Sequence, residues 1–352
     1  MTRRIRSARC ALLVPLVATL VAACSDDDGA GPPPTTPETE LAVVLNSVDR
    51  SLTVFAVDSP DARFTVGLGP DGSPVALAVR GTRAVVPMGI VPAAVVVDLK
   101  QRAVVHTVAL PENSGATGVA FLNDTLALVT NPGRNSVSVV NVLRGTAGPE
   151  IEVGEYPQAI VVVGDTAYVI NARLGPDFQP TGPGTITVLA GVPPAVIGTI
   201  QLSGLNPGDA GVGADGRLYV VHSGRFGQGD GSLSVVDRGT QAELQHHTGF
   251  GEFPGSIAVD NGGRVYVGSF GYGIAVWDAA TTSFVRSPAN AITPGGVPSS
   301  AGVGLDGAGR VYALEPECTK AARVFRLTAS YEVEAEVPVG VCPIAIAFTM
   351  VR

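Results

Sequence analysis

The sequence predicts an all-β fold, a seven-bladed β-propeller of four-stranded blades, over residues 41–352. An apolar–turn–apolar unit recurs about every 40–50 residues from residue 41 onward. Within each unit, small polar residues alternate with Val, Ile or Leu, the pattern of a strand with one buried face. The 44 glycines and 27 prolines suit the many turns that such short strands need.

The second strand of each unit is marked by a tyrosine in its later copies. The clearest copies are Asp165–Ile170, Gly216–Val221, Gly263–Gly268 and Gly309–Leu314. Their tyrosines (Tyr168, Tyr219, Tyr266 and Tyr312) lie about 46–51 residues apart. In the earlier units we expect Val85 and Ala127 in the position of the tyrosine. In the first unit this position falls near Val44.

The first and third strands of each unit can be predicted from the residues that begin them and from their alternation. Alternating third strands are expected at Asn135–Asn141, Gly184–Leu189, Gly231–Asp237 and Gly273–Asp278. First strands begin with a proline, at Pro74, Pro157, Pro254 and Pro343, where no ladder donor is needed. Small residues follow these prolines, as crowding around one axis requires. Asp215, Asp260 and Asp306 recur near strand ends, and we interpret them as turn formers.

The two ends of the repeat array complement one another. The last run, Pro343–Phe348, is a lone first strand, whereas the first unit, Leu41–Leu68, has three strands and lacks one. Pairing them closes a ring and removes both sheet edges, while the alternative, a linear solenoid, would need capped ends. The seven blades then start near residues 41, 74, 116, 157, 207, 254 and 298.

These repeats resemble the YVTN-type propellers of bacterial surface proteins. The resemblance lies in the Tyr-Val run, the polar loop after it and the Ser-Val-Val-Asp-like third strand, and it covers about residues 41 to 350. Tyr168-Val-Ile-Asn171 is the nearest copy of the tetrapeptide. The resemblance implies architecture and leaves the activity open. Trp277-Asp278 is the sole WD dipeptide, so the WD-repeat family fits less well.

Residues 1–23 have the features of a lipoprotein signal peptide. Four arginines (Arg3, Arg4, Arg6 and Arg9) precede the apolar run Ala11–Ala23, and Cys24 follows small residues in a sequence that resembles a bacterial lipobox. An ordinary secretory signal with a chance cysteine is the alternative. Residues 24–40 are polar and proline-rich, which predicts a disordered tether carried by a lipid on Cys24. We expect an exported, periplasmic or cell-surface lipoprotein, with Ser25 favouring the outer membrane.

After cleavage and lipidation, Cys318 and Cys342 remain as an even pair in an oxidising compartment. We predict a disulfide between them, with two free buried thiols as the alternative. Cys318 falls in the loop between the second and third strands of blade seven, and Cys342 in the connection to the closing strand. Both loops emerge on the same face of a propeller, so the bond would pin the ring where it closes.

Propeller ligands usually meet the face formed by the loops into the first strands and the loops between the second and third strands. Polar and aromatic groups there suit a carbohydrate, peptide or carboxylate partner. Solvated loop tips are the alternative for each residue. The candidate binding residues on this face are Asn131, Arg134, Asn171, Arg173, Phe178, His222, Arg225, Phe226, Phe270, Tyr272 and Glu315.

The sequence favours a non-catalytic binding or scaffold module for an envelope protein, peptide or glycan. Its formal net charge of −8 and its lack of a basic cluster argue against nucleic acid, and we expect contact with the membrane through the lipid alone. The sequence has no nucleophile elbow, phosphate loop or histidine cluster, so we expect no cofactor, no metal and a monomer. The alternative is a metal-dependent hydrolase similar to the lactonase and gluconolactonase propellers, with Asp209 the one acid placed at the channel mouth. A quinone dehydrogenase fits poorly, because the chain has one tryptophan.

Overall fold

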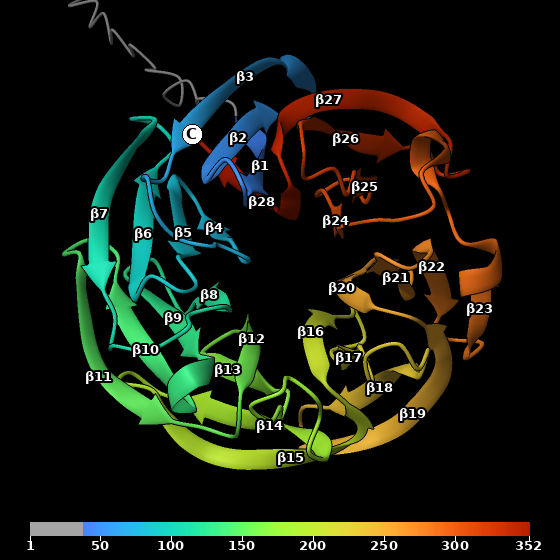
Figure 1. The fold of residues 1–352 in the computed structure, drawn as a ribbon, viewed down its shortest axis with the longest axis horizontal. Helices are drawn as coiled ribbons and strands as arrows, with labels where there is room; N and C mark the ends of the chain where they lie inside the picture. Colours follow the sequence, from blue (N-terminus) through green and yellow to red (C-terminus); the bar gives the residue numbers. More distant parts are fainter. Residues whose placement is uncertain (1–37) are drawn as a thin grey trace, which may run out of the picture. The chain divides into compact units, whose positions relative to one another are not determined.

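The computed structural model describes residues 38–352, which form seven four-stranded antiparallel sheets arranged around a central axis (Figure 1). The predicted seven-bladed propeller is therefore confirmed. The expected signal peptide, Cys24 and most of the expected tether lie outside the described residues, whereas Thr39 and Glu40, the last residues of that tether, already belong to a strand. Within residues 38–352, no helix is long and apolar enough to cross a membrane.

The first four blades contain the following strands. Blade one consists of β28 (Pro343–Val351), β1 (Thr39–Asn46), β2 (Ser51–Ala56) and β3 (Ser59–Gly67). Blade two consists of β4 (Ala78–Arg80), β5 (Arg83–Pro87), β6 (Ala93–Asp98) and β7 (Ala103–Ala109). Blade three consists of β8 (Val119–Phe121), β9 (Leu126–Asn131), β10 (Ser136–Asn141) and β11 (Thr146–Glu152). Blade four consists of β12 (Pro157–Val163), β13 (Thr166–Asn171), β14 (Pro183–Ala190) and β15 (Ala195–Leu205).

The other three blades repeat this order. Blade five consists of β16 (Pro207–Val212), β17 (Leu218–His222), β18 (Gly231–Asp237) and β19 (Ala242–Gly251). Blade six consists of β20 (Pro254–Val259), β21 (Arg264–Ser269), β22 (Gly273–Asp278) and β23 (Ser283–Arg286). Blade seven consists of β24 (Gly302–Leu305), β25 (Val311–Leu314), β26 (Ala321–Leu327) and β27 (Val333–Val341). Short 3-10 turns lie at η1 (Pro132–Arg134), η2 (Pro288–Asn290) and η3 (Pro294–Gly296).

The C-terminal strand closes the ring as predicted. β28 pairs antiparallel with β1 along its length, from Thr39 opposite Val351 to Asn46 opposite Pro343 (Figure 1). β1 is thereby the second strand of blade one, between β28 and β2. This pairing satisfies the backbone donors and acceptors that an open ring would leave at both of its ends.

The hydrophobic core is divided into seven layers, each between two neighbouring blades. The layer between blades four and five, for example, buries Tyr168, Ile186 and Leu218. The layer between blades seven and one buries Tyr312 against strands from both ends of the chain, including Val44. Because every layer joins two blades, the ring is stabilised as a whole and no blade has a core of its own.

One detail of the predicted repeat register was wrong. Tyr168 lies three residues before the end of its strand and faces the next blade. In blade three the equivalent residue is Leu128, because Ala127 faces the preceding blade. In blade one it is Val43 for the same reason. An error of one residue places a side chain on the opposite side of a strand.

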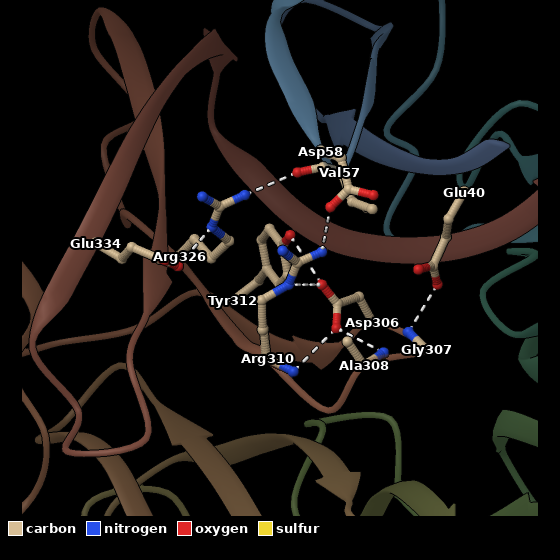
Figure 2. Close-up of polar contacts among 10 residues, drawn as sticks. All are labelled: Glu40, Val57, Asp58, Asp306, Gly307, Ala308, Arg310, Tyr312, Arg326 and Glu334. Carbon is tan, nitrogen blue, oxygen red and sulfur yellow. Dashed lines mark hydrogen bonds and ion pairs between the residues drawn. The ribbon is translucent and has the colours of Figure 1, made fainter.

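Polar contacts hold blades seven and one together at one end of the closure (Figure 2). Arg310 pairs with Asp306 of its own blade at 2.6 Å and with Asp58 of blade one at 3.0 Å. Arg326 donates to the Val57 carbonyl at 2.7 Å, and Glu40 accepts from the Gly307 amide at 2.7 Å. These contacts add charge-assisted hydrogen bonds to the strand pairing.

The predicted disulfide between Cys318 and Cys342 is present. It joins the loop between β25 and β26 to the residue directly before β28, so it ties blade seven to the closing strand. Nearby, Asp49 accepts a hydrogen bond from the Val341 amide at 2.7 Å. A disulfide of this kind indicates an oxidising, extracytoplasmic environment.

The three recurring aspartates are turn formers, as predicted. Asp260 accepts from the amides of Gly262 and Arg264, each at 2.8 Å. Asp306 caps the equivalent turn in blade seven and also accepts from the Tyr312 hydroxyl at 3.1 Å. Asp215 accepts from the Tyr219 hydroxyl at 2.8 Å. Each carboxylate links its turn to the tyrosine of the second strand, so the role of these aspartates is structural.

Candidate binding face and channel

The strand register brings two sets of loops to one face of the ring. Pro157, at the start of β12, lies opposite Asn171 at the end of β13, and Pro254 lies opposite Ser269 in the same way. Each loop into a first strand is therefore beside a loop between a second and a third strand. We call the surface formed by these two sets of loops the loop face.

Three of the predicted binding residues lie inside the blades and do not reach the loop face, so this part of the prediction was wrong. Asn131, Asn171 and His222 are fully buried at the ends of their second strands. Asn131 donates to Ser136 and Ser138, and Asn171 donates in the same way to Thr185 and Thr187. In these two blades an amide at this position joins the second strand to two hydroxyls of the third.

His222 occupies the same position in blade five. Its Nε2 lies 2.7 Å from the Ser234 hydroxyl, which in turn donates to Glu243 at 2.5 Å. Burial lowers the pKa of His222 to about 3, and the nearby His246 acts in the same direction. The imidazole is therefore neutral and structural at neutral pH, and it takes the place of the asparagine found in blades three and four.

The predicted charged residues belong to ion pairs. Arg134 binds Glu150 at 2.8 Å, and the pairing lowers the pKa of this glutamate. Arg225 lies 3.2 Å from Asp230, and Glu315 lies 2.7 Å from Arg323. Arg173 makes a longer pair with Glu155, at 3.4 Å. These charges are therefore compensated within the molecule.

The predicted phenylalanines are exposed. Phe178, Phe226 and Phe270 have 66%, 74% and 52% of their surface accessible, and they stand in the equivalent loops of blades four, five and six. We call these three residues the phenylalanine crown. Phe178 and Phe226 each contact an aromatic residue in a loop into a first strand, Tyr156 at 6.2 Å and Phe253 at 5.2 Å between ring centroids. Tyr272 is different, because its hydroxyl is buried without a hydrogen-bond partner.

The residue before the first strand adopts one unusual conformation in several blades. Tyr156, Asn206, Phe253 and Cys342 have φ of 53°, 51°, 51° and 63°, and each precedes a proline. Bulky residues seldom adopt this left-handed conformation, which costs on the order of 1–3 kcal/mol. In these blades the turn aims its side chain at the neighbouring loop, where it makes an aromatic contact, an amide hydrogen bond or the disulfide.

The first strands of all seven blades surround a cavity of about 430 Å³ at the axis. Its lining divides into two arcs. Val75, Ala301 and Ile344, from blades two, seven and one, form an apolar arc. The other arc, from blades three to six, presents polar side chains and the backbone of a glycine. It consists of Thr117, Gln158, Gly208, Asp209 and Ser256, and we call it the polar arc. None of the eleven predicted binding residues lines this cavity.

Hydrogen bonds between blades hold the polar arc in place. Thr117 donates to the Gln158 carbonyl at 3.0 Å, and the Gln158 side chain donates to Asn206 at 3.3 Å. Asp209 accepts from the Ala210 amide at 2.8 Å and from the Ile257 amide of blade six at 3.2 Å. Gln158 and Asn206 did not emerge as candidates from the sequence. Their position could have indicated them, because each lies beside a proline that starts a first strand, close to the axis.

Burial raises the pKa of Asp209 to about 7, although its two backbone hydrogen bonds oppose this change. Asp209 is the sole ionisable side chain among the described residues that line the cavity. Among residues 38–352, no group of three or more His, Cys, Asp or Glu side chains is placed to hold a metal ion.

Comparisons with known proteins identify the fold. No protein-family model matches this chain, and no curated protein sequence matches it. A functionally unknown protein from Desulfotomaculum acetoxidans has a similar structure, with a TM-score of 0.64 and 15% identity over 88% of this chain and 98% of that one. Hydrazine synthase from Kuenenia stuttgartiensis aligns with a TM-score of 0.57 and 17% identity over 72% of this chain and 76% of that one. At such identities the similarity shows a shared β-propeller fold, and the YVTN resemblance stays a prediction.

Proposed function

We propose that this protein is a non-catalytic binding module of the cell envelope, held at a membrane by a lipid on Cys24, which binds a protein or peptide through its loop face. The observation that carries this proposal is the phenylalanine crown. Three large aromatic side chains stand exposed at equivalent places in three consecutive blades. The interblade core does not use them.

The energetics of association support this role for the crown. Covering one phenylalanine side chain stabilises a complex by about 1.5–3 kcal/mol. The ion pairs Arg173–Glu155 and Arg225–Asp230 lie in the same loops. Protein interfaces are enriched in aromatic side chains together with polar and charged groups, and the aromatic residues contribute much of the affinity.

The location is proposed on two grounds. The disulfide is typical of proteins that leave the cytoplasm. The arginine-rich and apolar start of the chain, with Cys24 after small residues, is the pattern of a lipoprotein signal. A partner in the envelope is consistent with both.

Capture of partners from envelope extracts tests the crown. Phe178→Ser, Phe226→Ser and Phe270→Ser are combined in one variant of the full chain. The matched control combines Val196→Ser, Ile197→Ser and Val285→Ser, which alter apolar residues of similar exposure on the outer strands β15 and β23. We expect the crown variant to lose at least about 90% of the captured partner, because losing 1.4 kcal/mol already weakens binding tenfold, while the control keeps it. Equal capture by both variants would refute the proposed surface.

A further inference from the structure

The cavity at the axis contains a carboxylate without a cation. Asp209 lines the cavity, and its two hydrogen bonds come from backbone amides. None of the ion pairs formed among residues 38–352 includes it. A carboxylate has about four lone-pair positions, so two remain for a ligand. A carboxylate enclosed in this way is stabilised by a positive partner.

The space beside Asp209 is open. Gly208 and Gly255 flank this part of the cavity, and a Cβ on either would meet no atom nearer than 3.7 Å. The Gln158 amide oxygen lies 3.9 Å from the Cβ position of Gly208, so it is a second acceptor near Asp209. Deeper in the cavity the walls are aliphatic, with Ile160, Val303 and Ile346.

This combination fits one kind of ligand group. An ammonium has three donors, which suit one carboxylate and neutral amide oxygens. A divalent cation prefers several oxygen ligands, often more than one of them a carboxylate, and the described lining supplies one carboxylate. An alkyl stem that enters from the loop face would pack against the apolar arc of Val75, Ala301 and Ile344, while its charged end reaches the polar arc.

We propose that the cavity receives the side chain of a lysine presented by the bound protein or peptide, with the ammonium group on the Asp209 carboxylate. This inference rests on the proposed function and adds the chemistry that selects the partner. The phenylalanine crown would supply affinity at the rim, and Asp209 would supply specificity at the axis.

Binding of two small probes to the full-length protein in detergent tests the inference. The probes are Nα-acetyl-lysine amide and its norleucine counterpart, which keeps the alkyl stem and lacks the ammonium group. At about pH 8 we expect the lysine probe to bind at least tenfold more tightly than the norleucine probe, a difference of about 1.4 kcal/mol. At about pH 5.5 the preference should fall below threefold, because Asp209 is then protonated while the lysine probe stays charged.

Two variants locate the effect. Asp209→Asn keeps the acceptor for the Ala210 amide and removes the charge, so the preference for the lysine probe should disappear. Asp165→Asn, at an exposed turn away from the cavity, should keep it. Equal binding of both probes to the unmodified protein, or a preference that survives Asp209→Asn, would overturn the inference. The unmodified protein decides the question even if a variant does not fold.

The two proposals can fail separately. The probes are too small to need the phenylalanine crown, so the crown variant should bind the lysine probe as the unmodified protein does. Loss of partner capture in the crown variant, together with equal binding of the two probes, would keep the loop face as the binding surface and refute the lysine site alone.

Discussion

Arg310 of blade seven and Asp58 of blade one form an ion pair of 3.0 Å across the closure of the ring (Figure 2). Arg310 also binds Asp306, whose side chain is fully buried. We expect Arg310→Met to lower the free energy of unfolding by about 1–3 kcal/mol, because it leaves a buried carboxylate without its cation. Denaturant unfolding measures the change. Arg80→Met, which removes an exposed pair with Asp124, should cost less than about 0.5 kcal/mol, and an equal cost for both would contradict the role of the closure.

The disulfide should stabilise the ring by tying blade seven to its closing strand. Cys318 and Cys342 are separated by 24 residues in the sequence. Combined Cys318→Ala and Cys342→Ala substitutions should lower the free energy of unfolding by about 2–4 kcal/mol. A reductant should lower the thermal midpoint of the unmodified protein and leave that of the double variant unchanged. A midpoint that does not respond to reductant in either protein would show that the bond contributes nothing.

His222 should make the protein sensitive to acid. Its pKa is about 3 in the folded state and about 6.5 when unfolded. Because the folded pKa is the lower one, the stability from neutral His222 is complete above pH 6.5 and is lost as the pH falls toward 3. Between pH 7 and pH 5 the loss should be about 2 kcal/mol. His222→Asn restores the residue of blades three and four and should reduce this loss, which unfolding at several pH values would measure.

Asp209 should make the protein less stable as the pH rises, the opposite of the effect of His222. Its folded pKa of about 7 lies above the ordinary value of 3.8, so its contribution to stability is complete below pH 3.8 and is lost as the pH rises to 7. Asp209→Asn should therefore stabilise the protein at pH 8, by about 2–4 kcal/mol, and change little near pH 4. A variant less stable than the unmodified protein at pH 8 would show that the carboxylate is a structural group and would count against a binding role.

Cys24 should carry the membrane anchor. We expect labelling with an alkyne-modified fatty acid in the unmodified protein and none after Cys24→Ser, because this thiol is the predicted site of acylation. The Cys24→Ser protein should move from the membrane fraction to the soluble fraction. Cys10→Ser, within the predicted signal peptide, is the control and should keep both label and location.

The architecture could be predicted from the sequence because each blade repeats the same local pattern. The prolines at 157, 254 and 343 mark the starts of first strands, and the complementary ends of the array place β28 beside β1. The side of the strand on which each residue lies was harder to predict. Ala127 and Leu128 are both apolar, and only the position of the strand end at Asn131 decides which one faces the next blade.

The candidate site was less predictable, because polarity in the sequence does not distinguish a loop tip from a strand end. Asn131, Asn171 and His222 each precede a polar loop, yet their hydrogen bonds to third-strand hydroxyls bury them. Gln158 shows the reverse case, since it lies in an otherwise apolar strand but lines the channel. Such distinctions depend on where seven distant first strands meet.

Photo-crosslinking from the loop face can show whether this surface contacts a partner in the cell. The photoreactive residue p-benzoylphenylalanine replaces Phe226 in one variant and Ile197, an exposed residue of the outer strand β15, in another. Irradiated in intact cells, the position 226 variant should yield a crosslinked adduct with an envelope protein or peptide, and the position 197 variant should yield none. An adduct formed from position 197 and absent from position 226 would contradict the assignment of the loop face as the binding surface.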